Sequence, residues 1–401
     1  MKQSSRADNK IKQTKRTPII LVPGDGGSQI EAKLDKPEVV HYFCDRKTDA
    51  FFNLWLNLAL LVPFVIDCWT DNMRLVYDNS TRRTSNPPGV MTRIPHWGNT
   101  TAIEFIDPTQ VAGTAYFSVL VNELVREGYT RGVDLRGAPY DFRKAPQELE
   151  DFFVKFEALV KETYQMNGRE KMILVCHSMG CQMMLYFLNR RSQSWKDKYI
   201  SSLVTLACPW GGAVKALKAF ASGDNLGVIV VKALTIRKDE RTFPSLSFLL
   251  PTDKFWAHNE TIITTGKMNY TVANFDQFFK DINYTTGYNM WLDVRNLTYD
   301  LKHPRVELHC LHGDGISTME YLEYKNSTFP NQQPKITYGD GDGTVNIRSL
   351  RGCLKWNSTH PAKPFYYANF TNVEHMSIMG SPPIVNYIKK LAIRNVTYGR
   401  G

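Results

Sequence analysis

The chain contains the stretch Met172-Ile173-Leu174-Val175-Cys176-His177-Ser178-Met179-Gly180, which is the most informative part of its sequence. The run up to Cys176 is apolar, as in a strand buried on both faces. Apolar residues at helical spacing follow in 183–189. A serine between a buried strand and a helix, with a glycine two positions later, indicates a nucleophile elbow. Here Cys176 stands where the Gly-x-Ser-x-Gly motif has its first glycine.

Further strands alternate with helices on both sides of this elbow. Strands are predicted at 19–22, 203–207, 306–311, 335–338 and 365–370, and helices at 108–129, 146–166 and 383–393. Such alternation implies a mostly parallel sheet with helices on both faces. The predicted class is α/β, an α/β-hydrolase fold with an inserted cap and lid and a small apolar membrane-binding subdomain.

Length and composition fit one elaborated globular domain. The 401 residues are 43% hydrophobic and 22% charged, which excludes a largely disordered or fibrous chain. Half of the net charge of +10 lies in the first 16 residues. The remaining mild excess fits an anionic lipid surface, and no nucleic-acid partner is expected.

The expected division of the chain follows these patterns. We predict a disordered basic leader at 1–17, hydrolase core with the first strand and oxyanion loop at 18–40, the membrane-binding subdomain at 41–95, hydrolase core with the elbow at 96–213, the cap with its lid at 214–304, and hydrolase core with the acid and base at 305–401.

The body of the chain has the character of an exported protein, although the leader lacks the apolar region of a signal peptide. Asn-x-Ser/Thr sequons are dense, which predicts glycosylation in the secretory pathway and location in the lysosome or outside the cell. The seven cysteines are an odd number, and Cys176, Cys181 and Cys208 lie in apolar stretches as expected for free core thiols. The sequons are at Asn79, Asn99, Asn259, Asn269, Asn283, Asn296, Asn326, Asn357, Asn369 and Asn395.

Residues 50–66 form an uncharged apolar segment. It is too short to span a bilayer, and Pro63 interrupts its helical pattern. We expect it to insert into a membrane surface, while the alternative is a buried helical hairpin of the core. The residues expected to contact the membrane are Phe51, Phe52, Leu54, Trp55, Leu58, Leu61, Val62 and Phe64.

A serine nucleophile needs a base and a carboxylate that orients the base. In this fold the chain order is Ser, Asp, His. The glycine-rich stretch 339–345 offers Asp340 or Asp342 and could alternatively bind a cation, although EF-hand spacing is absent. His375 follows the strand at 365–370 and is the expected base. His177 is expected to be structural or to line the pocket, and His309 and His312 to be bystanders.

An oxyanion hole needs two N–H donors. The first candidate is the N–H of Met179, and the second is that of Asp25 in the loop Pro23-Gly24-Asp25-Gly26-Gly27 after the first strand. Alternatively, Asp25 is an ordinary turn residue. A phosphate-binding loop would need the Gly-Lys-Ser/Thr ending, which is missing.

Several motifs occur together in one order: 23–27, 31–37, 136–141, 177–180, 209–212 and 339–345. In these the chain resembles the lecithin:cholesterol acyltransferase-like family, which includes lysosomal (group XV) phospholipase A2. The resemblance implies a catalytic triad of Ser178, Asp342 and His375 and an oxyanion hole at Asp25 and Met179. It also implies disulfides Cys44–Cys68 and Cys310–Cys353 and a lid near 222–251. The chain departs from the family at Gly26, at Cys176 and in its basic leader.

The expected activity is that of a serine-dependent phospholipase A2 and O-acyltransferase. An acyl-serine intermediate would release fatty acid or pass its acyl group to a lipid alcohol such as ceramide, without metal or cofactor. The expected partners are an anionic phospholipid membrane and that acceptor, and the protein is expected to be a monomer. The alternatives are a secreted acyltransferase with a sterol acceptor and an inactive lipid-binding protein.

Overall fold

A computed structural model describes residues 11–111, 113–225, 231–357 and 363–398 of the chain. Its centre is a six-stranded sheet in which every neighbouring pair is parallel. In spatial order the strands are β16 (Phe365–Thr371), β13 (Glu307–Asp314), β10 (Ile200–Leu206), β9 (Met172–His177), β2 (Ile19–Val22) and β8 (Leu135–Gly137). The strands predicted at 19–22, 172–176, 203–207, 306–311 and 365–370 all belong to this sheet.

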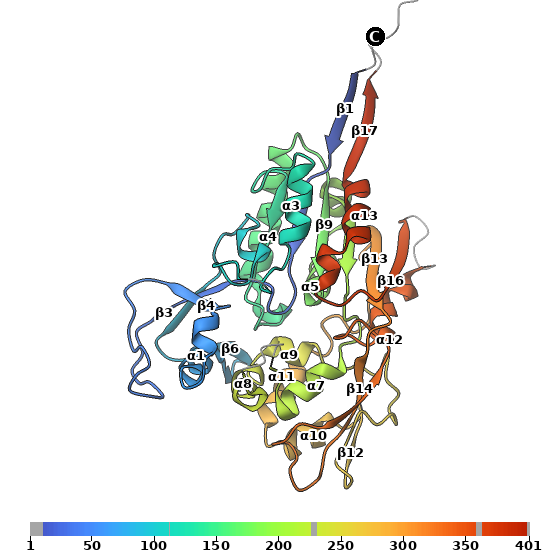
Figure 1. The fold of residues 1–401 in the computed structure, drawn as a ribbon. Helices are drawn as coiled ribbons and strands as arrows, with labels where there is room; N and C mark the ends of the chain where they lie inside the picture. Colours follow the sequence, from blue (N-terminus) through green and yellow to red (C-terminus); the bar gives the residue numbers. More distant parts are fainter. Residues whose placement is uncertain (1–10, 112, 226–230, 358–362, 399–401) are drawn as a thin grey trace, which may run out of the picture.

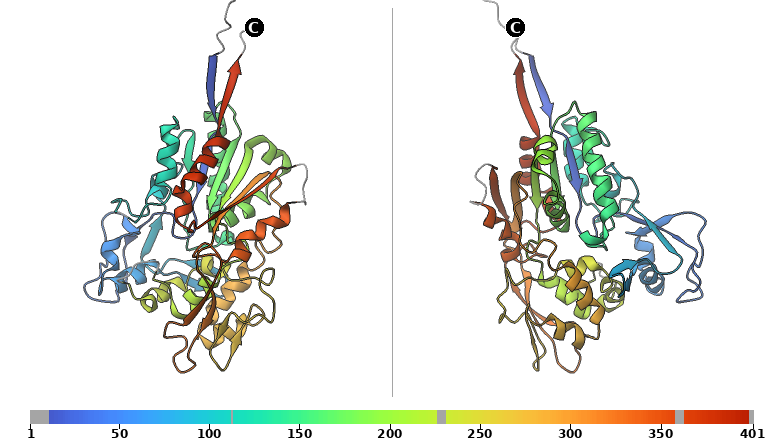
Figure 2. Two further views of the ribbon diagram at one scale, coloured as in Figure 1. Left: turned by 45° about the vertical axis from the view of Figure 1, so that its right-hand side comes forward. Right: turned by 180° about the vertical axis from the view of Figure 1, so that it is seen from behind.

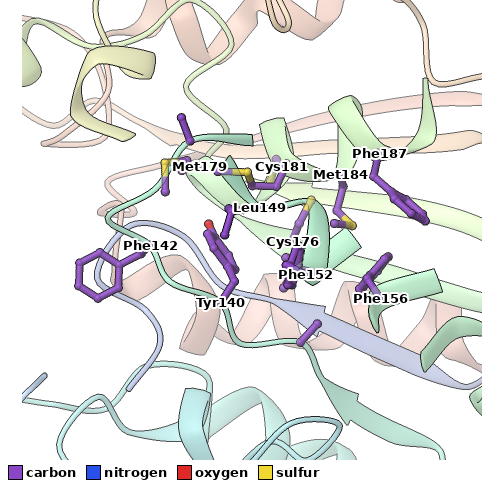
Figure 3. Close-up of a cluster of buried hydrophobic side chains, with 14 of the residues drawn as sticks. Tyr140, Phe142, Leu149, Phe152, Phe156, Cys176, Met179, Cys181, Met184 and Phe187 are labelled. Carbon is purple, nitrogen blue, oxygen red and sulfur yellow. The ribbon is translucent and has the colours of Figure 1, made fainter. Parts of the chain in front are cut away.

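Successive residues of a strand point to opposite faces of the sheet, so both faces carry apolar side chains, and helices cover both. Ile19 and Leu21 belong to one buried cluster, with α3 (Ser118–Arg126) and α13 (Pro382–Ala392). Ile20 and Val22 belong to the other, with α4 (Glu150–Met166), α5 (Met179–Leu188) and α6 (Gln193–Tyr199). Figure 3 shows the second cluster, in which Cys176 and Met184 lie among the aromatic side chains.

The helix expected at 108–129 begins only at Ser118. Before it lie α2 (Thr101–Glu104) and an irregular stretch with an isolated bridge between Phe105 and Ala115. The Asp107 carboxylate accepts the N–H of Thr109 at 2.8 Å, a turn that competes with helix formation. A short 3₁₀ helix, η2 (Pro146–Glu148), likewise precedes α4.

The segment after the first strand forms a small subdomain beside the sheet (Figure 1). Its antiparallel sheet has the order β4 (Phe52–Trp55), β3 (Ile30–Leu34), β7 (Val90–Arg93). Residues 30–34, expected in the hydrolase core, therefore pair within the subdomain. The remaining elements are η1 (Leu58–Leu61), α1 (Ile66–Met73), β5 (Val76–Asp78) and β6 (Arg83–Ser85), and a disulfide joins Cys44 to Cys68.

The apolar segment of this subdomain is largely folded inward, so three of its expected membrane contacts are wrong. Leu54, Trp55 and Leu61 are buried. The Trp55 ring packs against Phe142 at 5.4 Å, and its Nε1 donates to Gly26 O at 2.8 Å. Phe51, Phe52 and Leu58 are half-buried, and Val62 and Phe64 are exposed. The buried residues lie at the end of β4 and in η1, and the uninterrupted hydrophobicity of the segment did not reveal which of its side chains face inward.

Arg143 joins the subdomain to the core. Its guanidinium is fully buried, contacts Asp141 Oδ2 at 2.7 Å and donates to Met73 O at 3.0 Å, at the end of α1. The same side chain donates to Asn86 Oδ1 at 3.0 Å. A buried charge with all these partners holds the loop after β8 against the subdomain.

The cap packs over the carboxyl ends of the central strands (Figure 1). It contains α7 (Val214–Ser222), α8 (Ala233–Glu240), α9 (Pro244–Phe248), α10 (Phe275–Asp281) and α11 (Thr285–Val294), and it has its own buried cluster. Its sheet has the order β12 (Asn269–Tyr270), β11 (Ile263–Thr264), β14 (Thr318–Glu323), β15 (Lys335–Gly339).

The strand expected at 335–338 is thus not part of the six-stranded central sheet. It is β15, which pairs antiparallel with β14 in the cap sheet, so part of the segment assigned to the hydrolase core contributes to the cap. Its side chains are half-buried or exposed, and a strand of the central sheet would be covered on both faces.

The first described residues form a strand, which contradicts the expected disordered leader at this point. β1 (Ile11–Arg16) pairs antiparallel with β17 (Ile393–Tyr398), and the two form a ribbon that extends away from the body (Figure 2). The rest of the predicted leader, 1–10, lies outside the described residues. The partner strand is at the far end of the chain, so no local pattern predicts this pairing.

Short helices and a second disulfide complete the core. They are α12 (Ile347–Leu350), η3 (Arg351–Trp356) and η4 (Ser377–Gly380), and Cys310 on β13 is bonded to Cys353 on η3. Cys176, Cys181 and Cys208 are free and buried. Among the described residues, no helix has both the length and the apolar character to cross a bilayer.

The sequon asparagines lie mainly on the surface. Asn99 is half-buried, and its Oδ1 accepts the N–H of Thr101 at 3.2 Å. The side chain of Asn395 lies outside the described residues. The exposed ones are Asn79, Asn259, Asn269, Asn283, Asn296, Asn326, Asn357 and Asn369. Glycosylation stays a prediction that these positions permit.

Candidate active site

Ser178 lies at the sharp turn between β9 and α5. Its φ of 52° and ψ of −130° are strained for a non-glycine residue. The turn brings the first-strand loop close, because a Cβ on Gly180 would lie 2.2 Å from Pro23 O and one on Gly24 would lie 2.6 Å from Ser178 Cβ. Glycine at both positions is therefore needed for the elbow to form against this loop.

The structure brings Ser178, Asp342 and His375 together from distant parts of the chain. His375 Nε2 lies 3.0 Å from Ser178 Oγ, and its Nδ1 lies 2.7 Å from Asp342 Oδ2. All three residues are buried. With Nδ1–H donating to the carboxylate, Nε2 has a lone pair available for the serine hydroxyl proton, which is the arrangement of a serine nucleophile with its general base.

The structure distinguishes the two candidate aspartates in the 339–345 loop. Asp342 is buried, and its Oδ1 accepts the N–H groups of Thr344 at 3.1 Å and Val345 at 2.8 Å. Asp340 is exposed, and its Oδ1 accepts the N–H of Gly315 at 2.8 Å. Asp342 is thus the carboxylate that contacts His375, and Asp340 holds a neighbouring loop.

The first-strand loop lies against the elbow. The Gly27 N–H donates to Gly24 O at 3.1 Å, which closes a tight turn around Asp25. Asp25 lines the cavity beside Ser178. The N–H of Met179 begins α5, and the first N–H groups of a helix have no partner within it. Both predicted donors therefore belong to segments that lie next to Ser178, and their role as an oxyanion hole stays a prediction.

The Asp25 carboxyl has a perturbed acidity. Asp25 is exposed where it lines the cavity, but the protein groups around its carboxyl displace much of the bulk water there, and this desolvation raises its pKa to about 6 from 3.8. The positive charge of Lys215 and a hydrogen bond from the Gly26 N–H act in the opposite direction and are weaker. Removal from bulk water therefore dominates at this carboxyl.

A cavity of about 300 Å³ opens at Ser178. Its walls are mainly apolar and come from the core, the subdomain and the cap. Residues of α8 close one side, where burial raises the pKa of Asp239 and Glu240 well above the usual range. Residues 226–230 of the lid expected at 222–251 lie outside the described residues. The apolar walls include Trp55, Leu56, Leu61, Trp69, Met73, Ile106, Phe142, Ile236, Phe243, Leu246 and Leu249.

The remaining histidines lie in separate environments. His177 is buried next to Ser178 and lines the cavity, while His309 contacts Tyr387 Oη at 2.7 Å and His312 contacts Tyr367 Oη at 2.8 Å. The last two are not brought to Ser178, in agreement with their expected role as bystanders.

Two residues that lie at the site were not predicted from the sequence. Tyr116 lies where a helix was expected, and its hydroxyl contacts both Gly24 N and His177 Nδ1. Lys215 lines the cavity from the start of α7. Neither residue belongs to a local motif, so only its three-dimensional neighbours identify it.

Comparison with known proteins identifies relatives of the chain. Residues 51–382 match the family model of lecithin:cholesterol acyltransferase. A Rattus norvegicus protein named lysosomal phospholipase A and acyltransferase is 45% identical over 96% of this chain and 93% of its own. A Mus musculus phosphatidylcholine-sterol acyltransferase is 38% identical over 94% of this chain and 85% of its own.

Among solved structures, a chain in the Tle4–Tli4 complex has a TM-score of 0.52 at 13% identity, with coverage of 95% of this chain and 100% of that one. At this identity the likeness concerns the fold alone. The α/β-hydrolase fold and the expectation of an enzyme are confirmed by the family match and the parallel sheet. The chain belongs to the lecithin:cholesterol acyltransferase family.

Proposed function

We propose that the chain is a serine phospholipase A that also transfers acyl groups, with Ser178, Asp342 and His375 as its triad. The observation that carries the proposal is the continuous contact from Ser178 Oγ through His375 to Asp342 at the mouth of an apolar cavity. The names of the relatives, which include lysosomal phospholipase A and acyltransferase, suggest the substrate class. Membrane glycerophospholipids are the proposed acyl donors.

The proposed reaction has two halves. First, His375 Nε2 takes the Ser178 proton while Oγ attacks the ester carbonyl of the lipid. The N–H groups of Asp25 and Met179 stabilise the oxyanion. His375 then returns the proton to the leaving oxygen, the ester bond breaks, and a lysophospholipid departs from the acyl-serine. In the second half, water or a lipid alcohol gives its proton to His375 and attacks the acyl carbonyl. The bond from that carbonyl to Ser178 Oγ then breaks, Oγ takes the proton back from His375, and fatty acid or the acylated alcohol departs.

The cavity accounts for both outcomes of the second half. A volume of about 300 Å³ with apolar walls is at the lower end of the range for ligand pockets and can receive an acyl chain. An alcohol held within reach of the acyl-serine competes with water because positioning replaces a large part of the entropic cost of reaction. We propose ceramide as the representative acceptor.

We further propose that the subdomain docks on an anionic phospholipid surface. Phe64 is 82% exposed and Val62 is 43% exposed at the end of the apolar segment. Tyr42 and Phe43, in the loop that is tied to α1 by the Cys44–Cys68 disulfide, are also exposed. Exposed apolar groups on a cross-linked loop can insert into the interface without first ordering the chain.

The expected division into a hydrolase core, a membrane-binding subdomain and a cap with a lid stands as part of this proposal, with β3 moved to the subdomain and β14 and β15 to the cap. We also propose a monomer, glycosylated at its exposed sequons, that works in the lysosome or after secretion. Exposed Asn-x-Ser/Thr sites and two disulfides fit that route.

The test uses Ser178→Ala on anionic liposomes that contain ceramide and sterol, with products identified by mass spectrometry across pH. Ser202→Ala is the matched control, because Ser202 is buried and its hydroxyl has no partner among the described residues. We expect Ser178→Ala to form no fatty acid and no acylated lipid, and Ser202→Ala to form both.

Three results would redirect the proposal. Fatty-acid release by Ser178→Ala would remove this serine from the mechanism. Sterol ester as the main product would assign the chain to the sterol-acyltransferase alternative. A wild-type protein that forms no product and is not labelled by a fluorophosphonate would be an inactive lipid-binding protein.

A further inference from the structure

We propose that Tyr116 is a positioning residue that holds the oxyanion loop and the loop of His375 in register through His177. The inference rests on the proposed function, because it assigns to Tyr116 an effect on the geometry of the proposed triad and oxyanion hole. Tyr116 itself lies before α3, outside every motif recognised in the sequence.

Three hydrogen bonds carry the inference. The N–H of Gly24 donates to Tyr116 Oη at 2.9 Å. The same oxygen lies 2.5 Å from His177 Nδ1, and His177 Nε2 lies 2.9 Å from the backbone oxygen of His375. The chain of contacts therefore begins in the residue before Asp25 and ends on the proposed general base, and it passes beside Ser178.

The chemistry of the groups fixes the direction of each bond. A backbone carbonyl only accepts, so His177 Nε2 must carry a proton. Burial and the neighbouring His375 hold the pKa of His177 well below its usual range, so the ring is neutral and Nδ1 is an acceptor. The Tyr116 O–H must then donate to Nδ1, which leaves a lone pair on its oxygen for the Gly24 N–H. The Gly24 N–H and His177 Nδ1 are therefore paired only with the hydroxyl in place.

Packing leaves the hydroxyl little room to move. Tyr116 and His177 are both buried, and their rings meet edge to face at 5.4 Å. The Tyr116 N–H donates to Glu104 O at 2.8 Å. A Cβ on Gly27 would lie 2.5 Å from Tyr116 Cζ, so the oxyanion loop follows the surface of the ring. Loss of the oxygen would strand a buried N–H and a buried imidazole nitrogen, and the two loops would relax to find other partners.

The test compares Tyr116→Phe with Tyr140→Phe. Tyr140 is also a buried tyrosine, packed among the core aromatics, but its hydroxyl has no partner among the described residues (Figure 3). For Tyr116→Phe we expect kcat on liposomes to fall about 10- to 100-fold, the range for loss of one well-aligned contact, with KM changed less than about twofold. Tyr140→Phe should resemble the wild type in both constants.

A second readout separates positioning from general loosening. A trifluoromethyl ketone lipid adds Ser178 Oγ to its carbonyl and so needs the oxyanion hole, whereas an ether phospholipid only occupies the cavity. Tyr116→Phe should lose affinity for the ketone by the same factor as kcat and keep its affinity for the ether lipid. Equal losses for both ligands, or no loss beyond that of Tyr140→Phe, would overturn the inference.

Folding is controlled within the same experiment. All rates are normalised to the fraction of protein labelled by a fluorophosphonate. His177→Gln provides a second variant, whose amide N–H can still donate to the His375 carbonyl but which has no acceptor atom at the position of Nδ1. If Tyr116 and His177 act through the same series of hydrogen bonds, the kcat of the double variant is no lower than that of the more impaired single variant. Multiplicative losses would contradict this coupling.

The outcomes distinguish the inference from the function on which it rests. A fully active Tyr116→Phe beside an inactive Ser178→Ala overturns only the role of Tyr116. An active Ser178→Ala overturns the proposed triad itself.

Discussion

His375 contacts Asp342 twice, because its Nδ1 lies 2.7 Å from Oδ2 and its backbone N–H donates to the Asp342 carbonyl at 2.8 Å. The second contact fixes the histidine loop to the aspartate loop independently of the side chains. The ring orientation therefore depends on the carboxylate, while the approach of the two loops does not. This separation allows the proposed orienting role of Asp342 to be tested without moving the loops.

Asp342→Asn should lower kcat by about 10⁴-fold with little change in KM. The amide can present an N–H toward His375 Nδ1 and so favour the tautomer that cannot accept the Ser178 proton. Steady-state kinetics on liposomes measure the effect. Asp340→Asn is the matched control two residues away, and it should stay within a few-fold of the wild type. Equal losses in both variants would contradict the assignment of Asp342.

Gly180→Ala should destabilise the protein by about 1–3 kcal/mol and reduce activity per folded molecule. The new Cβ would lie 2.2 Å from Pro23 O, so the oxyanion loop or α5 must shift. Urea unfolding gives the free energy of unfolding, and fluorophosphonate labelling counts competent sites. Cys181→Ala, at the next position in the same helix, should retain activity per folded molecule. Unchanged labelling kinetics in Gly180→Ala would show that the contact is relieved without cost.

Phe64→Ser should weaken binding to phospholipid vesicles about tenfold, which corresponds to roughly 1.4 kcal/mol of apolar burial. The ring is 82% exposed at the end of the apolar segment, whereas Trp55 in the same segment is buried. Vesicle sedimentation measures binding, and hydrolysis of a soluble short-chain ester should be unchanged. Val154→Ser removes an exposed apolar side chain from α4 and is the control. Equal vesicle binding by both variants would refute docking through this loop.

Asp25→Asn should remove a pH dependence of stability. Because the folded state raises the pKa of Asp25 to about 6 from 3.8, it binds this proton more tightly than the unfolded state. The contribution to stability is complete below pH 3.8 and is lost as pH rises through about 6. The free energy of unfolding of the wild type should therefore fall relative to that of the variant across this window. Parallel curves from pH 3 to 8 would show that Asp25 does not titrate as described.

Much of the architecture could be predicted because its causes are local. An apolar run of β-branched residues forms a buried strand wherever it lies in a parallel sheet, and a serine followed by a close-approach glycine can only turn sharply into a helix. The central strands other than β8, the elbow at Ser178 and the helices α4 and α13 follow from such patterns, whereas β8 is a short strand that was not predicted. The end points of helices were less accurate, as at α3, where a local turn at Asp107 replaces helix.

Long-range pairing was not predictable in the same way. β15 has the β-branched and aromatic residues of a strand, yet its pairing with β14 places it in the cap, and β1 pairs with β17. Trp55 lies in a segment that is uniformly apolar in sequence, but its ring faces Phe142 and the cavity. The partners of β1 and Trp55 are far away along the chain, and β15 joins the cap through β14, which pairs with the distant β11. Hydrophobicity alone carries no information about which partner a segment meets.

The same distinction applies to the site. The elbow motif and the order of Ser, Asp and His along the chain can be seen in the sequence, and they were enough to identify a candidate serine, an acidic loop and a histidine. The residues alone left Asp340 and Asp342 open, and the family resemblance favoured Asp342. The contact of Asp342 with His375, the desolvation that raises the pKa of Asp25, and the hydrogen bonds from Tyr116 to His375 became visible only in three dimensions. Directed hydrogen bonds and desolvation depend on distances and enclosure, and those quantities exist only once distant segments have packed against each other.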